Sequence, residues 1–390
     1  MKRKLYMLLL LLVPLTALAG DGADEKKTPG ILKPVMWLKT LIDSMAVATI
    51  DRSYIEQPKR PWAVELRNEF NESTLKMNSD FPTVSGKNGN ITTETSSGFT
   101  TSVGLWAGYR GYGLGWSKEL TGGLGSTLSF GAMGGSFGIN FRINRYKSDT
   151  PKVKVTYDDK DTTFDLDEKM DLDDPISVRS LFLDGYYMFN GRHFSYAAAY
   201  DQSLIQRRSA GSLMAGAMYY HSSIDYTDQS NWPLVAFMQG VGKLKFTQAC
   251  VGLGYAYNWV PARGWLISAQ AMPMLQFYNK ISAYTYRFKL LGEDITDLVV
   301  FDFGPDDEGS GDDDGMDELV YELIELSEDN VVKTHNRIGW NFDARLAVVY
   351  NWERFYLRVY GHYNRFRYSN DMGHGRMSEW RAYASLGFRF

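Results

Sequence analysis

The chain has 390 residues, of which 44% are hydrophobic, 14% are aromatic and 23% are charged. Its formal net charge of −4 and the lack of a basic block argue against a nucleic-acid-binding protein. The single cysteine, Cys250, excludes a framework of intrachain disulfides, and its strand-like context suits a small buried side chain.

Residues 1–19 have the pattern of a secretory signal peptide. Basic residues at 2–4 precede an apolar run at 5–15, and Ala17 and Ala19 supply the small residues of a cleavage site. This run is too short for a spanning helix, and no later run reaches the roughly 18 apolar residues that such a helix requires. We therefore expect an exported protein from which the signal peptide is removed. It would be soluble, attached to a surface, or a β-barrel.

Residues 20–60 are expected to form a periplasmic segment in front of a main domain at 61–390. Within this segment, residues 34–48 have the spacing of a short amphipathic helix. Its apolar face would contain Val35, Leu38, Leu41, Ile42 and Met45. The alternative is a packed linker without a role of its own.

The end of the chain, from residue 340 to 390, alternates between apolar and polar positions. The apolar phase is rich in aromatic residues, whereas the polar phase carries charges and amides. The polar positions include Asp343, Arg345, Arg358, Tyr360, His362, Asn364, Arg381, Ser385 and Arg389. Each strand therefore has one apolar and one polar face, which is the pattern of an outer-membrane barrel with a polar lumen.

Thirteen ranges in the main domain have the pattern of strands. They are 62–71, 99–109, 112–120, 127–132, 136–146, 178–189, 193–203, 212–221, 248–259, 265–277, 338–350, 355–366 and 378–390. Tight turns at 190–192, 261–264 and 351–353 indicate the periplasmic side. The polar stretches 72–97, 147–177, 280–337 and 369–377 are expected as long external loops.

Thirteen strands conflict with the even number that a single-chain barrel needs when both of its ends lie in the periplasm. Merging two Gly-rich ranges of the first half into one kinked strand gives twelve, and a hidden strand near 235–246 would give fourteen. We favour about twelve. The predicted fold is all-β, an antiparallel up-and-down transmembrane β-barrel.

Several motifs together resemble a known family. They are Asp-Arg-Ser-Tyr-Ile at 51–55, Trp-Ala-Val-Glu-Leu at 62–66, the Gly-rich run at 108–116, Gln-Arg-Arg-Ser-Ala-Gly-Ser at 206–212 and Gly-Tyr-Ala-Tyr-Asn-Trp-Val at 254–260. Over about 51–390 the chain resembles an uncharacterised exported barrel family of Gram-negative bacteria, domain of unknown function forty-four twenty-one. The resemblance implies an outer-membrane barrel and supplies no activity or catalytic residue. Phe388 and Phe390 also look like the terminal signal read by the barrel-assembly machinery.

The Gly-rich run does not read as a phosphate-binding loop, because no helix pattern follows it. Its glycines alternate within strand periodicity. They are better interpreted as small residues on one face of the barrel, where strands bend or another element approaches.

The polar phase of the last strands provides the candidate lumen residues, Asp343, Arg345, Arg358, His362, Arg381 and Arg389. An arginine facing lipid near the midplane would cost several kcal/mol, so these side chains are expected to face inward. An inward ladder of Arg and Asp would brace a narrow lumen through ion pairs. In an open lumen the same ladder would favour the passage of anions.

Two histidines are the candidates for acid–base chemistry. His374 is expected in the last external loop between Asp371 and Ser378, and His362 on the polar face of a strand. The pattern permits a hydrolytic site at the membrane surface, but catalytic groups are recognised by geometry and not by proximity in sequence.

The acidic run at 306–318 is the candidate cation site, with Asp312, Asp314 and Asp317 as ligands. It does not fit the helix–loop–helix calcium pattern, because Ser310 would open the loop and Tyr321 would replace the closing Glu. A solvated surface loop is the preferred interpretation. We expect no metal and no cofactor.

The sequence thus favours a structural or transport barrel in the outer membrane, such as a narrow pore, in contact with outer-membrane lipid. The small solute is unknown. One alternative is a lipid-modifying hydrolase with a histidine base, and a second is an exported ligand-binding β-sandwich. The discriminating feature is whether the apolar faces of the strands point to lipid or to a second sheet.

Overall fold

The computed structural model describes residues 50–82, 88–96, 99–121, 125–148, 152–159, 162–169, 175–227, 231–232, 235, 240–296, 323–335, 338–370 and 373–390. The predicted signal peptide at 1–19 and the predicted helix at 34–48 lie outside these residues. Within the described ranges, no helix is long and apolar enough to cross a membrane.

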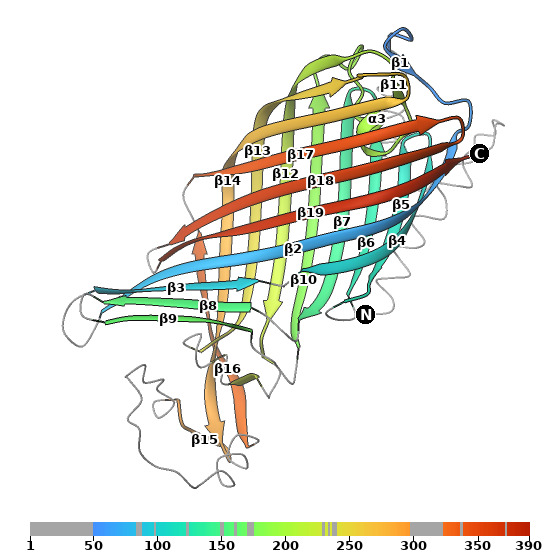
Figure 1. The fold of residues 1–390 in the computed structure, drawn as a ribbon. Helices are drawn as coiled ribbons and strands as arrows, with labels where there is room; N and C mark the ends of the chain where they lie inside the picture. The colour runs from blue at the N-terminus through green and yellow to red at the C-terminus, as the bar shows by residue number, and fades with distance from the viewer. Residues whose placement is uncertain are drawn as a thin grey trace, which may run out of the picture. The chain divides into compact units, whose positions relative to one another are not determined.

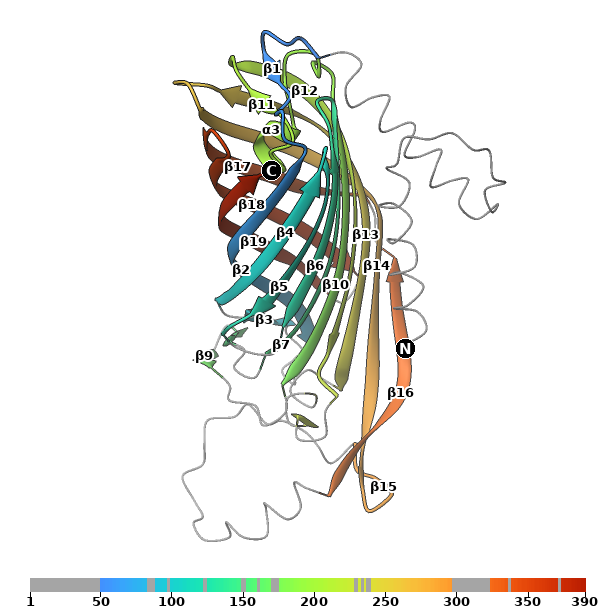
Figure 2. The same cartoon turned by 90° about the vertical axis from the view of Figure 1, so that its right-hand side faces the viewer.

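Twelve strands pair antiparallel with their neighbours and close into a ring (Figure 1 and Figure 2). In order around the ring they are β2 (Trp62–Pro82), β4 (Thr100–Tyr109), β5 (Tyr112–Glu119), β6 (Ser126–Met133), β7 (Phe137–Ser148), β10 (Ile176–Met188), β12 (Ala210–Asp225), β13 (Val241–Trp259), β14 (Trp265–Leu290), β17 (Gly339–Trp352), β18 (Phe355–Asn370) and β19 (Gly373–Arg389). The ring closes where β19 pairs with β2, from Gly373 opposite Ser79 to Arg389 opposite Ala63. The structure confirms the antiparallel all-β barrel and the expected number of about twelve strands.

One of the thirteen predicted ranges, 193–203, is not a strand of the barrel. It contains the short helix α3 (Ala197–Tyr200), and the side chains of Ala197, Ala198 and Ala199 are at most 1% exposed. The range alternates apolar residues, but it is covered on all sides and not on one face only. Both explanations of the odd count are therefore wrong. The Gly-rich ranges form separate strands, and residues from Val241 onward begin β13.

The two faces of the wall differ as the alternation predicts. On β17, Phe342 and Leu346 are 40% and 53% exposed, whereas Asp343 and Arg345 are 0% and 5% exposed. The same alternation continues on β18, where Arg358 is fully buried between two exposed residues, Leu357 and Val359. Because apolar side chains cover the outside and guanidinium groups lie inside, the wall has the polarity of a transmembrane barrel.

An aromatic girdle surrounds part of the barrel beside its tight turns. Neighbouring rings in this girdle have centroid separations of 4.6 to 6.5 Å. In order of contact they are Tyr109, Trp62, Phe390, Phe388, Phe355, Trp352, Tyr350 and Trp265. Such girdles mark the level at which a barrel wall meets the membrane interface.

Additional strands extend the wall at the end of the barrel away from α3 (Figure 1). β3 (Asn88–Ser96) pairs with the far part of β2 and with β8 (Lys152–Asp159), which pairs with β9 (Thr162–Lys169). β15 (Glu293–Asp294) and β16 (Ile324–His335) pair with the far part of β14.

Much of the stretches 72–97, 147–177 and 280–337 is therefore strand, where the sequence pattern indicated loops. Alternation was present, for example at Val153, Val155 and Tyr157 with Lys154 and Thr156 between them, but the many charged residues of these stretches obscured it.

Candidate functional site

The chain between β10 and β12 does not make the tight turn expected at 190–192. Instead, residues 189–209, here termed the plug segment, fold into the lumen at the end of the barrel that carries the tight turns; Figure 2 shows α3 at this end, between the strand walls. Arg345 Nη1 of β17 donates to Tyr196 Oη at 2.7 Å, and Asn258 Nδ2 of β13 donates to the Ser195 carbonyl at 2.9 Å. Arg389 Nη2 of β19 donates to Gln202 Oε1 at 3.2 Å. The plug segment is thus held from several sides of the ring.

Residues 51–56, which precede the first barrel strand, pair with the plug segment and hold it in place. β1 (Ile55–Glu56) pairs antiparallel with β11 (Ile205–Gln206), and Ile55 is fully buried. Two further backbone bonds, from Asp51 N to the Arg192 carbonyl at 2.9 Å and from Arg207 N to the Tyr54 carbonyl at 2.6 Å, extend this contact. The motifs at 51–55 and 206–212, which are far apart in sequence, therefore meet here.

The side chain of Asp51 links residues 51–56, here termed the strap, to the plug segment. Its Oδ1 accepts a hydrogen bond from the Ser53 amide at 2.8 Å, and its Oδ2 lies 3.5 Å from His193 Nε2 of the plug segment. The hydrogen bonds from Ser53 hold the pKa of Asp51 below its ordinary value. The strap therefore favours the ionised carboxylate.

A buried charge triad lies directly against the plug segment. Glu65 of β2 accepts from Arg358 Nη2 at 2.6 Å and from Arg67 Nε at 2.8 Å, and Tyr356 Oη donates to its second oxygen at 2.7 Å. Arg358 also donates to the Tyr200 carbonyl at the end of α3. One carboxylate thus serves two arginines, and one of these arginines holds the plug segment.

A second cluster crosses the lumen above the plug segment. Arg345 Nη2 of β17 lies 2.9 Å from Asp184 Oδ2 of β10, and Asp343 Oδ2 lies 2.6 Å from His362 Nε2. Tyr186 Oη donates to Asp343 Oδ1 at 3.3 Å. The arrangement is typical of a structural ion-pair network, in which each charge has a partner of opposite sign.

The third set of contacts joins β7 to β19, which are separated by β2, β4, β5 and β6 in the ring. Arg142 Nη2 donates to Glu379 Oε1 at 2.8 Å, and Arg381 Nη2 contacts Asn144 Oδ1 at 3.4 Å. The two pairs cross each other. On β7, Arg142 lies nearer to the plug segment than Asn144, whereas on β19 Arg381 lies nearer to it than Glu379. They form a bridge across the lumen.

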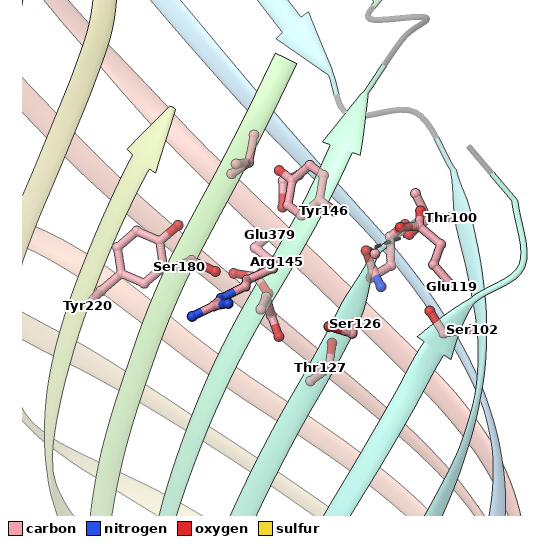
Figure 3. Close-up of a pocket in the computed structure, with 15 residues that line it drawn as sticks. Thr100, Ser102, Glu119, Ser126, Thr127, Arg145, Tyr146, Ser180, Tyr220 and Glu379 are labelled. Atoms are coloured by element: carbon pink, nitrogen blue, oxygen red, sulfur yellow. Dashed lines mark hydrogen bonds between the residues drawn. The ribbon is translucent and has the colours of Figure 1, made fainter. Parts of the chain in front are cut away.

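Two polar cavities lie in series along the lumen, on either side of this bridge. The outer cavity, of about 20 Å³, is lined from β2 by residues 71 and 73, from β7 by 144–146 and from β10 by 178 and 180. Figure 3 shows Ser180 and Tyr220 on one side of it and Thr100 and Ser102 on the other. The inner cavity, of about 80 Å³, is lined by 67 and 69, 140–142, and 182 and 184 of the same three strands. On every strand the inner set lies nearer to the plug segment.

The inner cavity ends on the plug segment, because Tyr200 of α3 lines it together with Arg345. Its wall carries four arginines and two carboxylates, namely Arg67, Arg142, Arg345, Arg381, Glu69 and Asp184. By the measure of roughly 10–15 Å³ per water, about 80 Å³ holds several waters or one small solute.

The Gly-rich run makes room for one large side chain in this cavity. A Cβ at Gly113 would lie 2.0 Å from the Trp106 ring, and one at Gly115 would lie 2.7 Å from it. Trp106 also stacks under Arg67, whose guanidinium carbon is 4.3 Å from the ring centroid. The glycines therefore allow an indole to lie flat against the inner wall.

All six predicted lumen residues, Asp343, Arg345, Arg358, His362, Arg381 and Arg389, are buried inside the ring. The structure brings Asp343, Arg345 and His362 into one cluster and places the other arginines against the triad, the bridge or the plug segment. Phe388 and Phe390 lie in the aromatic girdle.

The candidate catalytic and metal residues are not assembled into a site in the described residues. His362 contacts Asp343, Phe182 and Tyr360, and none of these three is the serine or cysteine of a hydrolytic triad. His374 lies on β19 opposite Asn78 and not in a loop, while Asp371 lies outside the described residues. The acidic candidates Asp312, Asp314 and Asp317 also lie outside them. In the described ranges, no three His, Cys, Asp or Glu residues are grouped to hold a metal.

Sequence reasoning missed the charged lumen residues of the first half of the chain. Glu65, Arg67 and Glu69 alternate with Val64 and Leu66 on β2, so a signal was present in the first predicted strand. Asp184 and Arg142 occupy the polar phase of β10 and β7 in the same way. Which charge pairs with which could not be read from any single strand.

Residues 49–390 match the model of a family described as a domain of unknown function (DUF4421). A search of curated proteins found no match.

Similar solved structures include the translocator domain of the autotransporter NalP from Neisseria meningitidis. It has 10% identity and a TM-score of 0.31, and the match covers 92% of this chain and 98% of that one. The outer-membrane protease OmpT from Escherichia coli has 7% identity and a TM-score of 0.36, with coverage of 86% and 98%. An outer-membrane channel from Pseudomonas putida F1 has 10% identity and a TM-score of 0.28, with coverage of 86% and 97%.

Proposed function

The chain belongs to the family described as a domain of unknown function (DUF4421), and from the geometry of its lumen we propose that it is an outer-membrane channel for small polar solutes. In the described conformation the plug segment closes this channel. The proposal places the tight turns in the periplasm and the extended strands outside the cell, as is usual for such barrels.

The observation that supports the proposal is the nature of the obstruction. Two polar cavities lie in series inside the barrel, and the floor of the inner one is Tyr200. Tyr200 belongs to a segment between two strands and not to the wall. The segment is held by hydrogen bonds, by a two-residue strand pairing and by packing of its buried side chains. Because it contributes no strand to the wall, it can leave the lumen without breaking the ring of barrel strands.

The lining of the lumen favours polar cargo over apolar cargo. An apolar solute would have to displace water from buried guanidinium and carboxylate groups, which is costly when their hydrogen bonds are not replaced. The cross-lumen bridge, Arg142 with Glu379, would limit passage to solutes small enough to move beside it or to separate the pair.

The test is a change of conductance when the plug segment is shortened. Residues 191–209 are replaced by Gly-Asn-Gly, which can join the ends because β10 and β12 are neighbours in the ring. In planar bilayers we expect the full-length chain to be closed for most of the time and the plug-shortened variant to show a small, steady channel.

A matched control replaces residues 152–169, the strands β8 and β9, by the same linker, since these strands lie outside the ring. This variant should conduct like the full-length chain. Because a shortened chain could fail to fold, each variant is first checked for the folded, heat-modifiable band. A folded plug-shortened variant with silent bilayers would contradict the proposed function.

A hydrolase is less well supported, although His362 and Asp343 form a close pair. The pair lies in the lumen between aromatic rings, where a lipid chain has no access from the outer face of the wall. Lipid turnover that disappears in a His374→Ala variant would instead favour the hydrolase.

A further inference from the structure

The wall of the inner cavity carries two charges of opposite sign that take part in none of the ion pairs described above. Of the charged groups on its wall, Arg67 lies 2.8 Å from Glu65, Arg142 lies 2.8 Å from Glu379, and Arg345 lies 2.9 Å from Asp184. Arg381 and Glu69 remain, and among the described residues neither has an oppositely charged group within 4.0 Å.

Both groups are more than nine-tenths buried, so water in the bulk does not compensate their charges. Among the described residues, Arg381 makes one hydrogen bond, from Nη2 to Asn144 Oδ1 at 3.4 Å, and its Nε has no hydrogen-bond partner. Glu69 accepts a hydrogen bond from Ser117 Oγ at 3.3 Å. Buried charges are normally paired, and these two are weakly satisfied.

The strand register places the two charges side by side on the same face. Glu69 lies opposite Tyr383, and Arg381 lies opposite Asn71, so Glu69 and Arg381 are diagonal neighbours on β2 and β19. Diagonal neighbours have Cα atoms about 7–8 Å apart. A small molecule between them can meet both charges at once.

We propose that the inner cavity binds a small zwitterion of amino-acid size, with its carboxylate on Arg381 and its ammonium group on Glu69. This inference rests on the proposed function, because the solute reaches the cavity through the lumen. It deepens that function by naming the class of solute.

A ligand with only one charge fits less well. A simple anion would satisfy Arg381 and leave Glu69 unpaired beside it, and a simple cation would do the reverse. A neutral solute would replace neither charge. The cavity of about 80 Å³ further restricts the ligand to a molecule of a few heavy atoms.

The test is calorimetric titration of the full-length chain in nanodiscs, with glycine as the probe and with acetate and methylammonium as its single-charge counterparts. We expect saturable binding of one glycine per chain. The affinity for acetate and the affinity for methylammonium should each be at least about tenfold lower than the affinity for glycine.

Two variants should change the preference between acetate and methylammonium in opposite directions. An unfolded protein would bind neither ligand more tightly. Glu69→Gln should weaken glycine binding by about tenfold and strengthen acetate binding. Arg381→Gln should weaken glycine binding similarly and strengthen methylammonium binding. The matched control is Arg376→Gln, which removes an exposed arginine from the same strand and should leave glycine binding unchanged.

The same titrations are repeated with the plug-shortened variant, in which the plug segment no longer blocks the path of glycine from the tight-turn end. Lack of glycine binding in both proteins, or acetate binding as tight as glycine binding in the full-length chain, would overturn the zwitterion site. Conductance of the plug-shortened variant without glycine binding would reject this inference and leave the channel standing. Glycine binding with silent bilayers would reject the channel alone.

Discussion

Glu65 provides the sharpest test of how the lumen is held together. It is fully buried, and its carboxylate lies 2.6 Å from Arg358 Nη2 and 2.8 Å from Arg67 Nε. In a Glu65→Gln variant the amide keeps the size and one acceptor of the carboxylate. Arg67 and Arg358 would then lose the one carboxylate that, among the described residues, lies within 4.0 Å of both.

The expected loss in free energy of unfolding follows from the number of unpaired charges that each variant leaves. Breaking a buried ion pair by removing one partner costs roughly 3–5 kcal/mol, and Glu65→Gln leaves two unpaired cations, so we expect the upper end, about 5 kcal/mol. Arg358→Met removes one of the two cations and leaves Glu65 and Arg67 as a matched pair. The loss is then that of charge-assisted hydrogen bonds, roughly 1.5–3 kcal/mol.

The assay is denaturant unfolding of the barrel in lipid vesicles, followed by tryptophan fluorescence. Glu353→Gln, at an exposed turn residue, is the matched control and should stay within about 0.5 kcal/mol of the unaltered protein. Equal losses for Glu65→Gln and Arg358→Met, or a larger loss for Arg358→Met, would refute the assignment of one carboxylate to two arginines.

Three further predictions concern the glycines, the outer face and the strap. Gly113→Ala should destabilise the barrel by about 1–3 kcal/mol, because its Cβ would lie 2.0 Å from Trp106; Gly361→Ala, where a Cβ would have no heavy atom within 4 Å, should be neutral in the same unfolding assay. Leu346→Lys should lower the free energy of unfolding in vesicles by roughly 2–4 kcal/mol, because this side chain would face the middle of the bilayer. Ile338→Lys, near the far end of β17, should lower it by about 0–1 kcal/mol. Similar losses for the two variants would argue against the membrane orientation. The lowered pKa of Asp51 means that its stabilising effect is complete above the ordinary value of 3.8 and is lost as the pH falls through the lower value of the folded protein. Hydrogen exchange at the Ile55 amide should therefore show an acid-dependent loss of protection that is missing in Asp51→Asn, and identical pH profiles for the two proteins would exclude this role of Asp51.

Periodicity predicted the wall of the barrel well, because each wall strand has lipid on one face and the lumen on the other. This is why the positions of Asp343, Arg345 and Arg358 inside the ring followed from the alternation of β17 and β18 alone. The exposed Leu346 and Leu357 define the opposite face in the same way.

The plug segment could not be predicted by the same argument. Phe194, Tyr196 and Tyr200 alternate like a wall strand, but periodicity does not reveal what covers a residue. Here the barrel itself covers both sides of the segment.

The pairings across the lumen were also beyond local sequence reasoning. Arg142 meets Glu379 only because the ring closes between β19 and β2. For the same reason the motifs at 51–55 and 206–212 were recognisable as distinctive, while their contact was not.

The central claim, that the plug segment alone separates the inner cavity from the tight-turn end, can be tested by the reactivity of one cysteine. Ser129 lines the inner cavity, and in a Cys250→Ala background Ser129→Cys would be the single thiol of the chain. We expect a membrane-impermeant thiol reagent added from the tight-turn side to leave this cysteine unmodified in the full-length barrel and to modify it readily in the plug-shortened variant. Rapid modification in the full-length barrel, or continued protection after the plug segment is shortened, would contradict the account.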